Sequence, residues 1–184
     1  MRTEKLKLKA SAVTVLLVIL LAPQTHGQQV RSDDALVSAA REIMTAARYC
    51  ALITTDSAGR THARAMDAFS PEADMKVWFG TNPRSRKVKE IRRNPKVTLY
   101  YFVPEDQAYV SITGTARLVN DPKEKANRFK DDWKAFYPDR VRDYLLIEVT
   151  PEKLELVSVK KGIVGDERAW QTPTVSFPRR KSHK

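Results

Sequence analysis

The chain has 184 residues, one cysteine and a formal net charge of +11, from 33 lysine and arginine against 22 aspartate and glutamate residues. This length predicts one domain with a single hydrophobic core, and the lone cysteine excludes an internal disulfide. Of the three histidines only His62 lies between the N-terminal segment and the C-terminal tail, which argues against a multi-histidine metal site and a Ser-His-Asp triad.

Residues 1–27 have the features of a secretory signal peptide. Basic residues precede an apolar run from Ala10 to Ala22, and small residues at Thr25 and Gly27 precede a cleavage point before Gln28. The run of 13 residues is shorter than the roughly 20 needed to span a bilayer, so we expect cleavage and no stable membrane anchor. The mature chain would be periplasmic or secreted, with a formal charge of +8 after loss of four basic and one acidic residue (+11 − 3). Export argues against nucleic acid as a partner despite this charge.

The mature chain begins with a predicted helix and a predicted hairpin. An apolar face predicts an amphipathic helix over Asp33 to Ala47, capped by Ser32 or by its first residue. Tyr49 to Thr55 and Arg60 to Phe69 read as two strands joined by an Asp-Ser-Ala-Gly turn. Cys50 lies in the apolar part of the first strand, which predicts a buried, unreactive thiol.

Further predicted strands surround a short helix. Met75 to Gly80 reads as a strand, and residues 88–94 as a short helix with Ser85 as N-cap and a proline at its end. Val97 to Val103 is a nearly continuous apolar and aromatic run, typical of a strand buried on both faces. Tyr109 to Leu118 alternates between apolar and polar positions, which predicts one inward face.

The last part of the chain is predicted to hold one helix, more strand and an irregular tail. Pro122 to about Phe136 predicts a second amphipathic helix, with Asp121 as N-cap. Tyr144 to Val149 and Lys153 to Val159 form either a strand pair or one bent strand. Residues 161–184 show no clear period and end in basic residues, which predicts an irregular basic tail.

These elements together predict a mainly β domain with flanking helices (α+β) over residues 28–160. Six or seven short strands, mostly linked as hairpins, are typical of a small antiparallel barrel. An OB-fold or a lipocalin-like barrel would have a similar number of strands, so the strands alone leave the topology open.

The start of the short helix is unusually basic. Four cations crowd the positive end of the helix macrodipole, where acidic residues normally lie: Arg84, Arg86, Lys87 and Lys89. A bound anion would remove this conflict. Free backbone N–H groups and the hydroxyls of Thr81 and Ser85 would complete a phosphate cradle. The alternative is a solvated basic helix face on a basic protein.

The same segment carries a wider pattern. Arg64-Ala65-Met66, followed about a dozen residues later by Phe79-Gly80-Thr81-Asn82-Pro83-Arg84-Ser85-Arg86-Lys87, resembles the pyridoxamine 5′-phosphate oxidase-like FMN-binding split barrels. The resemblance continues through residues 94–99 and 110–118, covers about residues 34–158, and is closest to the general stress protein branch. It implies an FMN-binding split β-barrel, a fold that explains the strand-helix-strand insertion better than the two alternative barrels.

The resemblance also implies a cofactor and a set of contacts. FMN would bind at eight positions that match the motif: Arg64, Ala65, Met66, Gly80, Thr81, Ser85, Arg86 and Lys87. Its phosphate would lie near Arg64 and the Ser85-Arg86-Lys87 run, where an arginine fork and a lysine can neutralise a dianion. Proteins of this family are usually homodimers with flavin at the subunit interface, and the aromatic run of residues 100–102 is compatible with such an interface as well as with core burial.

Two departures from the family pattern argue against pyridoxamine phosphate oxidation itself. Tyr109 stands where the vitamin B6 oxidase has a glutamine, five residues before Gly114, and the tail lacks an Arg-x-x-His motif. The leading hypothesis is a flavin-dependent oxidoreductase with another small substrate and no identified catalytic acid or base. The alternatives are a non-catalytic, stress-protective protein that binds flavin or a tetrapyrrole, and a basic barrel that binds polyanions without a cofactor.

Overall fold

The computed structural model describes residues 32–178, so the predicted signal peptide and the last six residues of the predicted tail lie outside the described part. The described elements are, in chain order, α1 (Asp33–Ala47), β1 (Tyr49–Thr55), β2 (Thr61–Asp67), β3 (Val77–Thr81), α2 (Arg86–Arg93), β4 (Lys96–Val103), β5 (Ala108–Val119), α3 (Pro122–Asn127), α4 (Arg140–Asp143), β6 (Leu145–Ser158) and β7 (Thr174–Ser176), with short 3-10 turns at Pro104–Asp106 and Asp131–Trp133. No helix within residues 32–178 is long and apolar enough to cross a membrane.

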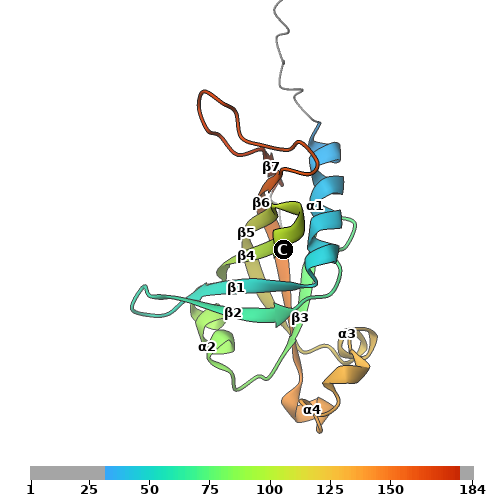
Figure 1. Cartoon of the computed structure of the whole chain (residues 1–184). Helices are drawn as coiled ribbons and strands as arrows, with labels where there is room; N and C mark the ends of the chain where they lie inside the picture. The colour runs from blue at the N-terminus through green and yellow to red at the C-terminus, as the bar shows by residue number, and fades with distance from the viewer. Residues whose placement is uncertain (1–31, 179–184) are drawn as a thin grey trace, which may run out of the picture.

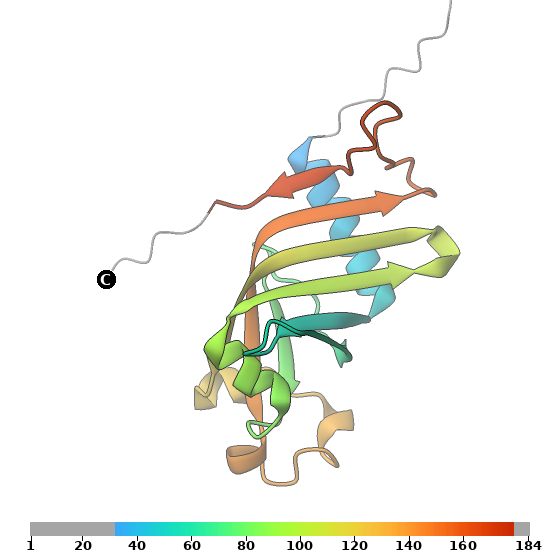
Figure 2. The same ribbon diagram turned by 90° about the vertical axis from the view of Figure 1, so that its left-hand side faces the viewer.

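The strands form one antiparallel sheet that curls into a half-barrel (Figures 1 and 2). Its order is β2-β1-β4-β5-β6-β3, with β7 added beside β6. The prediction of a mainly β fold with flanking helices is confirmed.

Helix α1 lies along one face of the curled sheet (Figure 2) and supplies one side of the main core. Leu36, Ala40 and Ile43 are buried on this side, and the hydroxyl of Ser32 caps the helix by accepting from the N–H of Ala35. Cys50 is buried on the facing strand as predicted, and this burial raises the pKa of its thiol to about 12. The thiol is therefore protonated and unreactive at neutral pH.

The barrel is nearly closed where β2 and β3 approach each other. Ala68, just after β2, forms an isolated bridge with Phe79 of β3, and the N–H of Phe69 donates to the carbonyl of Trp78 at 3.0 Å. Because the two strands run antiparallel from this bridge, the residues before Ala68 lie beside those after Phe79. This places Arg64 near the loop that leads into α2.

Of the two alternatives predicted for the last strand region, a strand pair or one bent strand, the structure has one bent strand, β6. β6 pairs with β5 along its whole length, and the register shifts between Thr113 and Gly114. A Cβ atom at Gly114 would lie 2.3 Å from the carbonyl oxygen of Thr150, so only glycine permits this close passage of the two backbones.

The prediction that Val97–Val103 is buried on both faces is wrong. Tyr100 and Phe102 of β4 are 39% and 53% exposed, whereas Leu99 and Tyr101 are buried. Helix α1 covers only one face of β4, so the alternate aromatic side chains point outward from the other. An apolar run in the sequence cannot by itself distinguish a strand covered on both faces from a strand with one exposed apolar face.

Two further predictions need correction. The second long helix ends at Asn127 instead of about residue 136. The chain turns there so that Phe129 and Trp133 can pack in an aromatic cluster with Tyr144, and Phe136 is left exposed. Part of the segment predicted as irregular tail forms β7, which is too short to produce a periodic pattern in the sequence.

Candidate functional site

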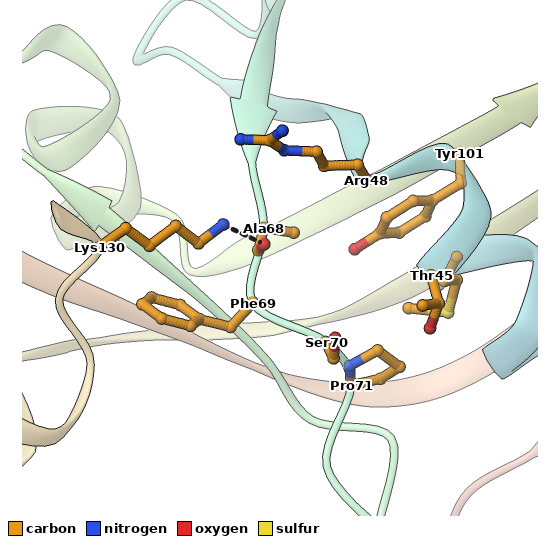
Figure 3. Close-up of a pocket in the computed structure, with 9 residues that line it drawn as sticks. Thr45, Arg48, Ala68, Phe69, Ser70, Pro71, Tyr101 and Lys130 are labelled. Carbon is orange, nitrogen blue, oxygen red and sulfur yellow. Dashed lines mark hydrogen bonds between the residues drawn. The ribbon is translucent and has the colours of Figure 1, made fainter. Parts of the chain in front are cut away.

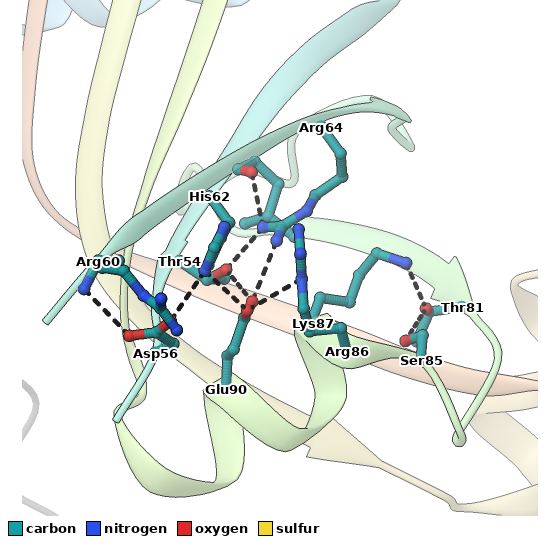
Figure 4. Close-up of polar contacts among 11 residues, drawn as sticks. Thr54, Asp56, Arg60, His62, Arg64, Thr81, Ser85, Arg86, Lys87 and Glu90 are labelled. Carbon is teal, nitrogen blue, oxygen red and sulfur yellow. Dashed lines mark hydrogen bonds and ion pairs between the residues drawn. The ribbon is translucent and has the colours of Figure 1, made fainter. Parts of the chain in front are cut away.

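Five of the sequence-predicted site residues gather beside the gap between β2 and β3 (Figure 4). Arg64 comes from β2 and Thr81 from the end of β3, and Ser85, Arg86 and Lys87 form the start of α2. We call this group the cradle. The antiparallel approach of β2 and β3 creates it from segments about 20 residues apart.

The carboxylate of Glu90 lies at the centre of the cradle and is only 4% exposed. It accepts hydrogen bonds from the hydroxyl of Thr54 and from Nη2 of Arg64 at 3.0 Å, and Nε of Arg86 lies 3.2 Å from its other oxygen. Arg64 is held further by hydrogen bonds that it donates to the carbonyl of Leu52 and to the hydroxyl of Thr54. These contacts fix the guanidinium group of Arg64 on the inner side of β2.

Sequence reasoning missed Glu90, although a signal for it exists. Glu90 follows Arg86 by four residues, the spacing at which helical side chains of opposite charge meet. It also lies between Val88 and Ile91, which form the buried side of α2. A carboxylate on the core-facing side of a basic helix is a candidate for a structural counter-ion.

The ionisation of Glu90 follows from its partners. Burial alone would raise the pKa of its carboxyl group, but the hydrogen bond from Thr54 and the charge of Arg64 outweigh burial, so the pKa is lowered. Glu90 is therefore ionised at neutral pH and neutralises part of the positive charge of the cradle.

Lys87 is the cation of the cradle without a counter-ion. Its Nζ donates to the hydroxyl of Thr81 at 3.2 Å, and within residues 32–178 no acidic group lies within ion-pair distance of it. Burial and the nearby charge of Arg64 lower the pKa of Lys87. An anion beside Lys87 would raise this pKa again and stabilise the ammonium group.

The N-terminus of α2 is not capped by its own serine. Ser85 has the extended backbone of an N-cap residue, but its side chain makes no capping hydrogen bond and lies 3.2 Å from the hydroxyl of Thr81. The N–H groups of Arg86 and Lys87 therefore remain available to an acceptor from outside the helix, whereas that of Val88 donates to the carbonyl of Ser85.

The balance of charge in the cradle is positive. Arg64, Arg86 and Lys87 contribute +3 and Glu90 contributes −1, which leaves a net charge of +2 (+3 − 1); Arg64 and Lys87 are partly buried, and Arg86 is exposed. His62 lies beside the cradle, with its Nε2 3.0 Å from Oδ2 of Asp56 and 3.7 Å from Oε1 of Glu90. The other two basic residues of the predicted cluster do not take part, because Arg84 pairs with Asp143 and Lys89 is exposed.

The remaining three predicted site residues do not direct side chains into the cradle. Ala65 is exposed on the outer face of β2, and Met66 is buried in the main core. A Cβ atom at Gly80 would lie 2.5 Å from the ring of Trp133 and 2.6 Å from that of Tyr144, so the aromatic cluster already fills this space. These residues could contact a ligand only through backbone atoms or, at Ala65, from the outer face.

No group of three or more histidine, cysteine, aspartate and glutamate residues in the described part of the chain could hold a metal ion. The donors of the cradle are instead ammonium, guanidinium, hydroxyl and amide groups. This donor set is suited to the oxygens of a phosphate or another anion.

The sequence and the fold were compared with known proteins. The sequence model of one family, described as "Pyridoxamine 5'-phosphate oxidase like", matches residues 36–164. No curated protein matches the chain.

Solved structures resemble the fold. A Clostridium acetobutylicum protein related to general stress protein 26 has a TM-score of 0.66 and 20% identity, over 79% of this chain and 97% of its own. A pyridoxamine 5′-phosphate oxidase-related, FMN-binding protein from Nostoc punctiforme has a TM-score of 0.60 and 15% identity, over 83% and 100%. General stress protein 26 from Bacillus anthracis has a TM-score of 0.58 and 22% identity, over 66% and 93%. At these identities the likeness establishes the fold, and the predicted split β-barrel is confirmed.

We predict that Glu90→Gln destabilises the fold at neutral pH by about 2–4 kcal/mol, because it leaves the half-buried Arg64 without its counter-ion. The lowered pKa means that this contribution is present above the ordinary carboxyl pKa of 4.5 and is lost as the pH falls below it. Urea unfolding at neutral and acidic pH measures both effects.

The control is Glu105→Gln, the same change at an exposed position, which should alter stability by less than about 0.5 kcal/mol. Equal effects of the two substitutions at neutral pH would contradict the role of Glu90.

Proposed function

Because the chain belongs to the pyridoxamine 5′-phosphate oxidase-like family, we propose that it binds FMN and that the cradle holds the phosphate group. One observation carries the proposal: the cradle has a net charge of +2 with the half-buried Lys87 unpaired. A phosphate monoester carries up to two negative charges at neutral pH and would balance this excess.

The residues of the cradle fit a phosphate group. Lys87 and Arg86 supply cations on one side and Arg64 on the other, while Thr81 and Ser85 supply hydroxyls. The uncapped N–H groups of α2 add donors along the helix axis. Glu90 accepts a hydrogen bond from Arg64 and forms an ion pair with the exposed Arg86, and its charge lowers the net charge of the cradle to what one dianion can balance.

The outer face of β2 offers a place for the ring system. Ala65 is small and exposed there, so a flat ligand could approach the strand backbone closely. FMN would supply one- and two-electron redox chemistry when bound, while the protein would orient it and limit its contact with water.

We propose that the protein is an oxidoreductase with an unidentified small substrate. His62 is the conventional acid–base candidate between the predicted signal peptide and the tail, but its ring is engaged with Asp56. Because His62 is engaged in this way, the structure fits equally well the second candidate function, a protein that binds flavin or a tetrapyrrole without catalysing a reaction. Reduction of bound FMN by a candidate donor and reoxidation by an acceptor distinguish the two.

We further propose a homodimer formed through the outer face of the sheet. Ala65 pairs with Ala51, and Ala51 with Tyr100, so the three side chains lie in one row on this face. Tyr100 stacks on Tyr109 at 5.6 Å, and Phe102 is exposed beside them. A second copy covering these aromatics would also enclose a ring lying against Ala65.

We predict that the protein binds FMN and that Lys87→Ala weakens the affinity by roughly 10–100-fold, the range expected for one charge-assisted hydrogen bond. The matched control is Lys89→Ala, which removes an exposed lysine two positions along the same helix and should change the affinity less than about twofold. Quenching of FMN fluorescence during titration measures each dissociation constant. Equal losses in both variants would show a general charge effect and contradict the cradle.

We predict that the purified chain is a dimer and that Phe102→Glu shifts it to monomer, because the substitution places a charge in an apolar contact. The control is Phe136→Glu, since Phe136 is also an exposed aromatic but lies away from the sheet face. Light scattering coupled to size-exclusion chromatography gives the mass. A wild-type monomer would overturn the dimer proposal.

We propose that the chain is exported and processed, and we predict that a bacterial host releases a form beginning at Gln28. The substitution Leu17→Arg interrupts the apolar run and should leave the precursor unprocessed inside the cell. Mass spectrometry of the periplasmic and cytoplasmic fractions distinguishes the two forms. Recovery of the intact precursor from wild-type cells would contradict export by this signal.

A further inference from the structure

A cavity with a mixed polar and apolar lining lies beyond the C-terminal end of β2 (Figure 3). Its volume is about 230 Å³. Its lining comes from the end of α1, the segment after β2, β4 and the segment after α3: Met44, Thr45, Arg48, Ala68, Phe69, Ser70, Pro71, Tyr101 and Lys130. None of these residues belongs to the cradle.

The hydroxyl of Tyr101 is the first feature that suits this cavity to a ligand. Tyr101 is 1% exposed, and its hydroxyl has no hydrogen-bond partner that meets normal geometry within residues 32–178. The neighbouring thiol of Cys50 is at best a weak partner. An unpaired buried hydroxyl costs about 1–3 kcal/mol, and this one points into the cavity (Figure 3).

The charges around the cavity favour a monoanion. Arg48 and Lys130 both pair with Asp67, at 3.5 Å and 2.7 Å, and Lys130 also donates to the carbonyl of Ala68 at 2.8 Å. Two cations and one carboxylate leave a net charge of +1 (+2 − 1). The cradle, by comparison, has +2. The smaller excess suits a carboxylate better than a phosphate dianion.

The rest of the lining is suited to a hydrocarbon group. Met44, Ala68 and Pro71 are apolar, and the ring of Phe69 lies 5.0 Å from the ammonium of Lys130. A cavity of about 230 Å³ has room for roughly seven groups the size of a water molecule. This size corresponds to a small organic acid.

We propose that this cavity binds a small organic carboxylate. Its carboxylate group would lie between Arg48 and Lys130 and accept a hydrogen bond from Tyr101, while its hydrocarbon part would pack on Met44 and Phe69. The proposal does not depend on FMN binding, because it uses a different set of residues and a different ligand class.

Benzoate is a suitable probe, and benzamide is its uncharged analogue of the same shape. Isothermal titration of the full chain should give saturable benzoate binding with a dissociation constant of about 1 mM or tighter, and at least tenfold weaker binding of benzamide. Lys87→Ala should leave benzoate binding unchanged, which would place the site outside the cradle.

The decisive variant is Tyr101→Phe, which removes a hydroxyl whose one described neighbour, the thiol of Cys50, is a weak partner, and so should change stability little. It should weaken benzoate binding by roughly 10–100-fold, the effect of one hydrogen bond to a charged acceptor, whereas the control Tyr109→Phe on the outer face should not. Absence of saturable binding, equal binding of benzamide, tighter binding of inorganic phosphate than of benzoate, or no effect of Tyr101→Phe would each overturn the proposal.

Discussion

Arg64 and Lys87 are partly buried beside the exposed Arg86, and the carboxylate of Glu90 offsets part of the repulsion among these three cations. It contacts both guanidinium groups and lies on the core-facing side of α2, where water cannot replace it. Lys87 lies beyond ion-pair distance of Glu90, so the charge of Glu90 offsets that of Lys87 only in part. The charge repulsion in the site is therefore low enough for the chain to fold, and the remaining positive charge can attract an anion.

The sheet determines where this charge cluster forms. Curling brings β2 and β3, the two ends of the sheet order, against each other at the bridge between Ala68 and Phe79. The aromatic rings of Trp133 and Tyr144 pack on Gly80 and hold β3 from the other side. The same aromatic packing ends α3 early, so the shortened helix and the position of the cradle have a common cause.

Much of the fold could be predicted from local patterns. The apolar periodicity of α1, the hairpin of β1 and β2 and the alternation in β5 all place side chains as the sequence predicts, because each depends on neighbouring residues. The outer exposure of Tyr100 could not be predicted, since it depends on which face α1 covers. The pairing of Glu90 with Arg64 was missed for a similar reason, because it joins residues 26 positions apart through the closure of the barrel. Motif resemblance identified Arg64, Thr81, Ser85, Arg86 and Lys87 as a group, and the structure brings these five together.

The central claim is that the cradle holds the phosphate of FMN. The most direct measurement is the visible absorption spectrum of the purified protein after addition of FMN and removal of free flavin by desalting. We predict a retained two-banded flavin spectrum whose intensity corresponds to one FMN per chain. A colourless protein would not affect the assignment of the split-barrel fold but would contradict the assignment of FMN to the cradle.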